Sequence, residues 1–189
     1  MPDKRWEVLH SQILVDSPWL RLRAEACRMP GGQVLDPFFV AEKSDWVNVV
    51  ALTSGEELVL VRQYRHGLGR MVLEVPGGCI DPQDASPEAA ARRELLEETG
   101  CLAREWTHTG VYSPNPNDHT NLVHAFLARG VEQVAGQTLD ATEELEVVRI
   151  PLADLDAMLA GGEFLQAMHL AALFYALRAL EGKPPGGSV

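Results

Sequence analysis

Residues 77–101 read GGCIDPQDASPEAAARRELLEETGC, and the chain on either side is organised around them. Within this stretch Ser86 is a favourable N-cap, Pro87 suits the first position of a helix, and Gly100 suits a left-handed C-cap. Residues 87–99 are therefore predicted to form a helix whose two ends are set by their capping residues.

Three glutamates of the predicted helix, Glu94, Glu97 and Glu98, stand at i, i+3 and i+4 and share one face. One interpretation is a solvated acidic face on which Arg93 pairs with Glu97. The other is a site for a hard divalent cation, which would offset the repulsion between Glu94 and Glu98 with oxygen ligands. Gly77 favours the second interpretation, because a glycine lets a backbone carbonyl come close to whatever the glutamates hold.

The run RELLEETGC from Arg93 to Cys101, preceded by Gly78 and an acidic loop residue, resembles the Nudix box. That pattern is G-x5-E-x7-R-E-U-x-E-E-x-G-U, in which U is apolar. The chain departs from the pattern in the loop, where the expected glutamate falls on Asp84. Eight residues instead of seven separate Asp84 from Arg93, which leaves the role of Asp84 open and the helical glutamates in place.

The resemblance implies a metal site and a set of catalytic residues. The implied ligands of Mg²⁺ (or Mn²⁺) are the Gly77 carbonyl and the carboxylates of Glu94, Glu97 and Glu98. Arg93 would orient these glutamates. The general base would come from the loop before the last strand, as Glu143 or Glu144, with Glu98 as a competing choice.

Composition bounds the class of protein. The chain has 189 residues, 46% of them apolar, and a formal charge of −11, which fits one domain with or without a small appendage. No apolar run reaches the length of a membrane span and the first residues do not form a signal peptide, so no membrane partner is expected. Three cysteines without metal-ligand spacing favour a reduced, cytoplasmic protein. The acidic balance argues against nucleic-acid binding.

Residues 1–45 are predicted to form a small β unit with strands at 7–14, 20–29 and 34–41 and a turn at 30–32. Trp6, Trp19, Phe38 and Phe39 present more aromatic surface than three isolated strands can bury. They either pack on the main domain or form a dimer interface. The resemblance favours a homodimer, since Nudix enzymes acting on ADP-ribose and nucleotide sugars carry such a sheet and often exchange it between subunits.

Residues 46–181 are predicted to form the main domain, followed by a disordered tail over 182–189. The predicted strands are residues 47–53, 58–64, 71–75, 105–112, 122–128 and 145–150. The predicted helices are residues 87–99, 152–160 and 164–181, and the polar segment 136–144 is expected to be mobile. This pattern predicts an α+β fold, and the resemblance implies the Nudix α/β/α sandwich with a mixed sheet.

Four further residues are candidates for substrate binding. Arg65, at the end of a strand, matches the arginine that holds substrate phosphates in the subgroup that the chain resembles, and such a planar donor suits them. Glu74 is either an outward strand residue or a ribose or supporting contact. Pro116, fifteen residues beyond Cys101, resembles the proline associated with Nudix enzymes of the ADP-ribose type, and Asp118 shares its loop.

The resemblance therefore implies Mg²⁺-dependent hydrolysis of the pyrophosphate bond of ADP-ribose or another nucleoside diphosphate sugar, giving a nucleoside monophosphate and a sugar phosphate. A first alternative is a Nudix hydrolase acting on a dinucleoside polyphosphate or an oxidised nucleotide. A second alternative is a non-catalytic regulator that binds a nucleotide sugar. The clustered carboxylates argue against the second alternative, because binding alone does not require them.

Overall fold

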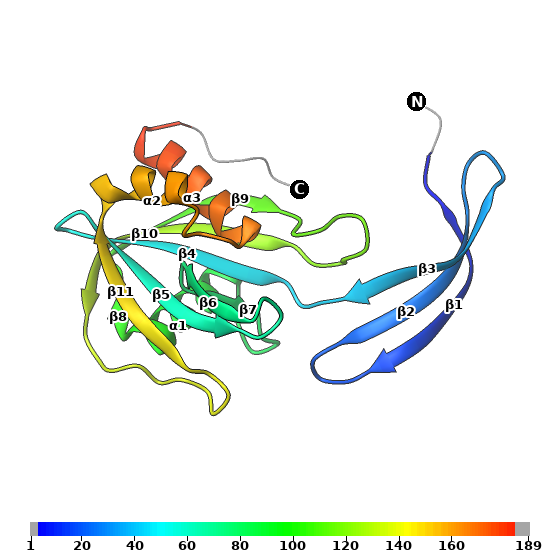
Figure 1. The fold of residues 1–189 in the computed structure, drawn as a ribbon, viewed down its shortest axis with the longest axis horizontal. Coiled ribbons are helices and arrows are strands. Elements are labelled where there is room, and N and C mark those ends of the chain that lie inside the picture. The colour runs from blue at the N-terminus through cyan, green and yellow to red at the C-terminus, as the bar shows by residue number, and fades with distance from the viewer. Residues whose placement is uncertain (1–3, 184–189) are drawn as a thin grey trace. The chain divides into compact units, whose positions relative to one another are not determined.

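The structure is a computed structural model that describes residues 4–183, and its chain separates into two units (Figure 1). The first unit comprises the residues up to Ser44 together with Ser113–Asn121, and the second comprises Asp45–Tyr112 and the residues from Leu122 onward. The predicted disordered tail lies outside the described residues except for Gly182 and Lys183. Both of these donate backbone hydrogen bonds to the last helix.

The first unit is the predicted three-stranded antiparallel sheet. It consists of β1 (Glu7–Asp16), β2 (Arg21–Arg28) and β3 (Val34–Glu42) in the order β1-β2-β3. Every residue of β1 is exposed, and Trp19 in the β1–β2 turn has 82% of its surface exposed. Trp6 packs edge-on against Phe38, with 5.5 Å between the ring centroids. The sheet therefore leaves much of its apolar surface uncovered within one chain.

The segment Ser113–Asn121 belongs to the first unit through backbone hydrogen bonds to the end of β3. The Ala41 N–H donates to the Asp118 carbonyl at 2.8 Å, and the Thr120 N–H donates to the Ala41 carbonyl at 3.2 Å. The sequence placed this segment with residues 46–181, because hydrogen bonds between distant parts of the chain leave no local pattern.

The second unit is built on an eight-stranded mixed sheet. Its central order is β11-β5-β4-β10-β8, with β6 paired to β5, β7 to β4 and β9 to β10. The central pair β4–β10 is parallel and the other pairs are antiparallel, which confirms the predicted mixed sheet. The strands are β4 (Trp46–Thr53), β5 (Glu57–Arg65), β6 (Arg70–Glu74), β7 (Gly77–Cys79), β8 (Cys101–Leu102), β9 (Glu105–Tyr112), β10 (Val123–Gln133) and β11 (Leu145–Pro151).

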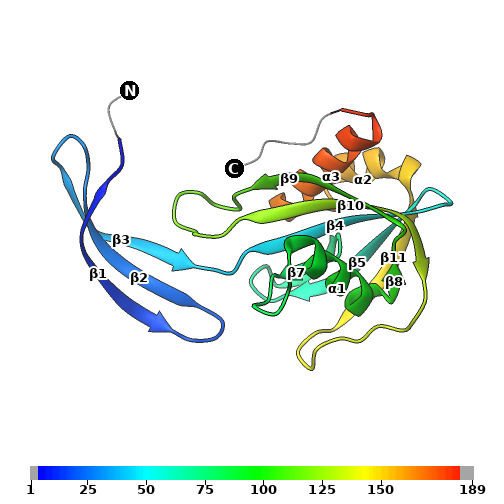
Figure 2. The same ribbon diagram turned by 180° about the vertical axis from the view of Figure 1, so that it is seen from behind.

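Helices cover both faces of this sheet, which confirms the α/β/α sandwich (Figures 1 and 2). The helices are α1 (Pro87–Thr99), α2 (Leu155–Gly161), which follows a 3₁₀ turn at Leu152–Asp154, and α3 (Ala167–Leu180). Successive side chains of β4 point to opposite faces of the sheet and so enter two separate core clusters. Val49 packs on the α1 side, and Val50 packs on the side of α2 and α3.

Helix α1 has the boundaries that its caps predict. The Ser86 side chain accepts a hydrogen bond from the Ala89 N–H, and Gly100 adopts φ 67°, the left-handed conformation. Ala90, Ala91 and Leu95 are fully buried against the sheet. These small and apolar side chains bring the acidic side of the helix close to β7, where it pairs with the start of β4.

Candidate functional site

The glutamates of α1 differ in their exposure. Glu94 and Glu98 are buried, with 8% and 3% of their surfaces exposed, whereas the Glu97 side chain is 41% exposed. Burial of a carboxylate requires hydrogen bonds or a nearby positive charge. The acidic face of α1 is therefore a largely buried cluster of carboxylates, and the first interpretation, a solvated acidic surface, does not describe it.

Gly77 and Gly78, where the chain turns from β6 into β7, lie directly against these carboxylates, and this pair is called the Gly77–Gly78 loop. The Gly77 N–H donates to Glu98 Oε2 at 3.0 Å. A Cβ atom at Gly77 would stand 2.1 Å from the Val47 carbonyl oxygen, and one at Gly78 would stand 2.3 Å from a carboxylate oxygen of Glu94. Gly77 must be glycine because its neighbour is backbone, whereas a Cβ atom at Gly78 would displace the end of the Glu94 side chain.

The guanidinium of Arg93 donates hydrogen bonds to several acidic side chains around it. It donates to Glu94 at 2.8 Å, to Glu97 at 3.0 Å and to the Cys79 carbonyl at 3.0 Å. It also forms two bonds with Asp84, at 2.9 and 3.2 Å, and these bonds lower the pKa of Asp84. The lengthened loop thus still brings its acid to Arg93.

Replacing Asp84 by asparagine is expected to lower the free energy of unfolding by about 1–3 kcal/mol, because a buried, charge-assisted pair with Arg93 is weakened. Urea unfolding checks this value. Asp81→Asn is the matched control, since Asp81 lies 3.8 Å from Arg93 and is 43% exposed. An equal loss in both variants would contradict a specific role for Asp84.

The electrostatics of the cluster favour a cation. Burial raises the pKa of Glu94 to about 7, and Arg93 acts against this shift. Burial also raises the pKa of Glu98 well above its usual value, with the charges of Glu94 and Glu143 adding to the rise. The Gly77 hydrogen bond and the charge of Arg65 act in the opposite direction.

The segment before β11 has no helix or strand, yet it is attached to the C-terminal end of α1. The Thr138 N–H donates to the Glu97 carbonyl at 2.8 Å, and Gln137 Nε2 donates to the Glu98 carbonyl at 2.7 Å. The sequence predicted a mobile segment here and gave no signal for Gln137. Of the two candidate bases carried by this segment, both exposed, Glu143 is the one whose charge raises the pKa of Glu94 and Glu98.

Arg65 and Glu74 form a pair at the adjoining strand ends. Glu74 is 1% exposed and accepts three hydrogen bonds from Arg65, the shortest at 2.6 Å, and one from Gln63 at 3.0 Å. The outward-facing alternative for Glu74 is therefore wrong, because its carboxylate is buried and paired. Gln63 was not singled out in the sequence, where nothing distinguishes it from an ordinary strand residue.

The remaining two candidates, Pro116 and Asp118, belong to the first unit. The Asp118 side chain accepts a hydrogen bond from Asn115 within the same loop, and its carbonyl bonds to β3. The structure thus groups the α1 carboxylates, Gly77, Arg93, Glu143 and the Arg65–Glu74 pair in the second unit. It does not place Pro116 and Asp118 relative to them.

The groups around the Gly77–Gly78 loop fit a hard divalent cation. The available donors are all oxygens, from carboxylates and a backbone carbonyl, which Mg²⁺ and Mn²⁺ prefer. Within residues 4–183, the side chains are not arranged so that three or more His, Cys, Asp or Glu could hold a metal ion together. In this arrangement Glu94 and Glu97 bond to Arg93, and Glu98 bonds to the Gly77 N–H, through one oxygen each. Each carboxylate has a second oxygen, so it can bind a cation while it keeps its hydrogen bond.

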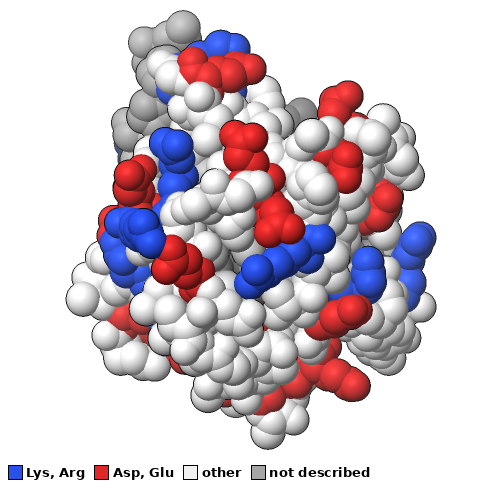
Figure 3. Space-filling model, turned by 90° about the vertical axis from the view of Figure 1, so that its left-hand side faces the viewer, with Lys and Arg blue, Asp and Glu red and all other residues white. Residues whose placement is uncertain are grey.

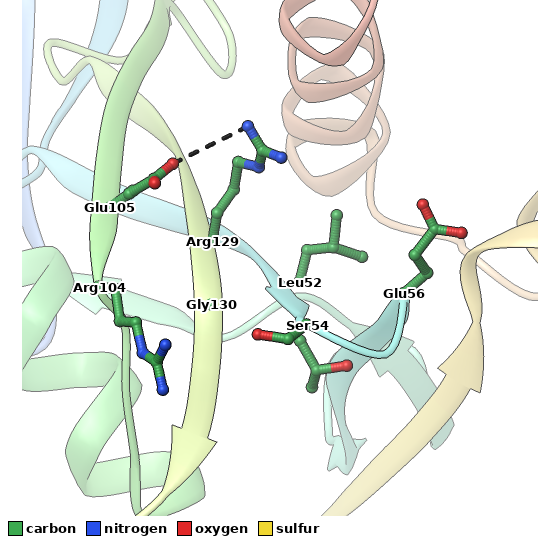
Figure 4. Close-up of a pocket in the computed structure, with 8 residues that line it drawn as sticks. Leu52, Ser54, Glu56, Arg104, Glu105, Arg129 and Gly130 are labelled. Carbon is green, nitrogen blue, oxygen red and sulfur yellow. Dashed lines mark ion pairs between the residues drawn. The ribbon is translucent and has the colours of Figure 1, made fainter.

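A separate cavity of about 290 Å³ lies at the opposite end of β4 from the strand's pairing with β7 (Figure 4). The β4–β5 turn, Arg104, Glu105 and Arg129 line it, and Arg129 pairs with Glu105 at 3.9 Å. None of the predicted site residues borders this cavity, and its arginines are balanced by glutamates.

The surface seen in Figure 3 carries basic and acidic side chains side by side, with no basic stripe on that face. In the described part of the chain, no helix combines the length and the apolar character of a membrane span.

Comparison with protein families gives two matches. Residues 44–169 match the NUDIX domain, and residues 6–41 match the nucleoside diphosphate sugar hydrolase N-terminal domain. The two matches together cover both the carboxylate cluster and the three-stranded sheet.

Curated relatives and solved structures agree with this assignment. An ADP-ribose pyrophosphatase of Mycobacterium tuberculosis is 30% identical over 173 residues, covering 90% of this chain and 83% of the relative. A GDP-mannose pyrophosphatase of Klebsiella pneumoniae is 28% identical over 181 residues, covering 89% of each chain. The crystal structure of an ADP compounds hydrolase superposes with a TM-score of 0.84 at 25% identity, covering 95% of this chain and 96% of that one.

The NUDIX match spans more than half of the chain and contains the whole α1 cluster together with the Gly77–Gly78 loop. The resemblance of the run RELLEETGC is thereby confirmed. The chain belongs to the NUDIX family.

Proposed function

We propose that this protein is a Nudix pyrophosphohydrolase that cleaves the pyrophosphate bond of ADP-ribose or another nucleoside diphosphate sugar, releasing a nucleoside monophosphate and a sugar phosphate. The observation that carries the proposal is the buried carboxylate cluster of α1 beside the Gly77–Gly78 loop. The choice of substrate rests on the N-terminal domain match and on relatives named ADP-ribose and GDP-mannose pyrophosphatases.

The proposed ligands of Mg²⁺ or Mn²⁺ are the Gly77 carbonyl and the carboxylates of Glu94, Glu97 and Glu98. A bound divalent cation would polarise the phosphoryl oxygens and neutralise the charge that develops on them. Arg93 would orient Glu94 and Glu97, to which it donates hydrogen bonds. Asp84 would in turn hold Arg93.

Glu143 is the proposed general base. Its charge acts on both Glu94 and Glu98, which supports a position beside the cluster, and its exposure gives it access to water. In this role it would accept the proton of the attacking water molecule. Glu98 is the less favoured base, because it is buried and already accepts the Gly77 N–H.

Arg65 is proposed to hold the substrate phosphates. Its guanidinium is fixed on one side by the buried Glu74, and its side chain remains 34% exposed. A guanidinium held in this way keeps donors for an anion without having to be ordered on binding. Pro116 and Asp118 are proposed to contact the remainder of the substrate.

Arg65→Lys is expected to raise KM about tenfold with a smaller effect on kcat, because a point charge replaces a planar donor of several hydrogen bonds. Steady-state kinetics check this. Arg62→Lys is the matched control on the same strand, since Arg62 bonds only weakly, at 3.4 Å, to the exposed Glu146. An unchanged KM in Arg65→Lys would show that Arg65 does not bind the substrate phosphates.

The protein is further proposed to be a cytoplasmic homodimer formed through its N-terminal sheet. The support is the exposure of β1 along its whole length and of apolar residues such as Trp19 and Phe39, which a monomer rarely leaves uncovered. The reduced and buried Cys27 and Cys101 fit a cytoplasmic location. Sedimentation of the full chain as a monomer would contradict the dimer.

The test of the proposed function is a substrate panel with Mg²⁺ or Mn²⁺, scored for release of nucleoside monophosphate. The panel contains ADP-ribose, GDP-mannose, other nucleotide sugars, a dinucleoside polyphosphate and an oxidised nucleoside triphosphate. The expected result is cation-dependent cleavage of a nucleotide sugar with the highest kcat/KM. Preference for one of the last two compounds would overturn the substrate class, and binding without cleavage would overturn catalysis.

A further inference from the structure

The segment Val75–Gly77, which joins β6 to β7, is held at three successive residues by three different elements. Helix α3 provides the first partner, strand β4 the second and helix α1 the third. The bonds are Val75 N–H to His169 Nδ1 (3.0 Å), Val49 N–H to the Pro76 carbonyl (2.8 Å) and Gly77 N–H to Glu98 Oε2 (3.0 Å).

His169 is the unexpected member of this set. Its side chain is buried in the first turn of α3, with 1% of its surface exposed. Its Nδ1 accepts a hydrogen bond from the N–H of Val75, which lies 94 residues earlier in the chain. Accepting at Nδ1 requires a neutral ring with its proton on Nε2. Burial and the charge of Arg65 lower the pKa of His169 to about 3, so the ring stays in this accepting state at neutral pH.

Val75 depends on this acceptor. The ladder between β5 and β6 ends with the pair Val61 and Glu74, so the next N–H along the chain has no strand partner there. Val75 is itself 1% exposed, and a buried N–H requires an acceptor. If His169 did not supply one, Val75 would have to move toward another acceptor, and Pro76, with its fixed φ, would transmit that movement to Gly77.

We propose that His169 is a positioning residue of the metal site: its Nδ1 fixes the backbone at Val75 and thereby the Gly77 carbonyl two residues later. The inference rests on the proposed function, in which that carbonyl is a cation ligand. His169 acts entirely through the backbone and does not contact the substrate or the cation.

Two substitutions separate the hydrogen bond from the packing of the ring. His169→Leu keeps an apolar side chain of similar size and removes the acceptor, whereas His169→Asn places an amide oxygen where Nδ1 stands. Binding of Mn²⁺ to the full-length protein, measured by electron paramagnetic resonance without substrate, is expected to weaken about 10–100-fold in His169→Leu. His169→Asn is expected to recover most of this loss. In kinetics, the Mg²⁺ concentration for half-activation should rise more than kcat falls.

Leu173→Ala is the control for a general loss of packing, because Leu173 is 1% exposed in the same helix and belongs to the core. It is expected to lower the melting temperature while leaving the affinity for Mn²⁺ within about threefold of the wild type. If Leu173→Ala and His169→Leu weakened Mn²⁺ binding equally, His169 would act only through packing in the core, and the proposal would be overturned.

A measurement on the wild-type protein does not depend on any variant folding. Coupling between two sites is reciprocal, so saturating Mg²⁺ should slow hydrogen exchange at the Val75 amide by a factor comparable to the affinity lost in His169→Leu. Exchange at Val75 that is unchanged by Mg²⁺ would overturn the proposal. So would Mn²⁺ affinity in a folded His169→Leu variant that equals the wild-type value.

The Glu98→Gln variant distinguishes this inference from the proposed function. If wild-type Mn²⁺ binding depends on Glu98 but not on His169, only the inference fails. If the wild-type protein binds no Mn²⁺, or binds it independently of Glu98, the proposed metal site fails and the inference fails with it.

Discussion

Glu98→Gln is expected to reduce cation-dependent hydrolysis roughly a thousandfold or more, since a cation ligand that supplies several kcal/mol of charge stabilisation is lost. The fold should survive the change. The substituted side chain keeps an amide oxygen that can accept the Gly77 N–H, and the substitution removes a buried charge that lies near the charges of Glu94 and Glu143. The metal-free variant should therefore melt at or above the wild-type temperature and gain no stability from Mg²⁺.

Kinetics with the best substrate of the panel and melting curves with and without Mg²⁺ check both parts. Glu88→Gln is the matched control on the same helix, because Glu88 is 46% exposed and pairs only with Arg92. Its activity should remain within about twofold of wild type. Full activity in Glu98→Gln would remove the α1 carboxylates from the mechanism.

Gly77→Ala and Gly78→Ala are expected to fail in different ways, although the two residues are adjacent. The Gly77 methyl group would meet the backbone carbonyl of Val47 at 2.1 Å, so β7 and β4 must separate. This overpacking should cost about 3 kcal/mol of unfolding free energy, together with the activity.

The Gly78 methyl group would instead meet the carboxylate of Glu94, which is the mobile end of a side chain. Gly78→Ala should therefore lose less than about 1 kcal/mol of stability, because that carboxylate can swing aside. Displacing Glu94 should nevertheless weaken Mn²⁺ binding about 10–100-fold.

Urea unfolding and Mn²⁺ titration separate these two outcomes. Gly161→Ala, at a position where an added Cβ meets no atom within 4 Å, is the control and should change neither quantity. Loss of stability in Gly78→Ala equal to that in Gly77→Ala would show that the loop responds as one rigid piece.

The parts of the fold that depend on neighbouring residues were predictable from the sequence. The caps Ser86 and Gly100 place both ends of α1, and the spacing of its glutamates places them on one face. The three strands of the N-terminal unit follow from alternation and from the turn at residues 30–32. Local hydrogen bonds and periodicity produce these features, and both can be seen in a short window of sequence.

The features that the sequence did not reveal depend on contacts between distant residues. Residues 136–144 are attached to α1 through hydrogen bonds to backbone carbonyls. Because every residue has such a carbonyl, no side-chain pattern in the sequence predicts this attachment. The burial of Glu74 depends on where β6 lies in the sheet. The pairing of Asp84 with Arg93 survives a lengthened loop because a long arginine side chain can reach an acid displaced by one residue.

The hydrogen bonds between β3 and Ser113–Asn121 have a consequence for chimeric enzymes. A graft that exchanges only residues 1–44 with those of a relative would leave the backbone partners of Ala41 behind in the recipient loop. Transplanting an N-terminal unit therefore involves two pieces of chain, the N-terminal strands and the loop that carries Pro116. Substitutions accumulating in these two pieces during evolution are expected to compensate one another.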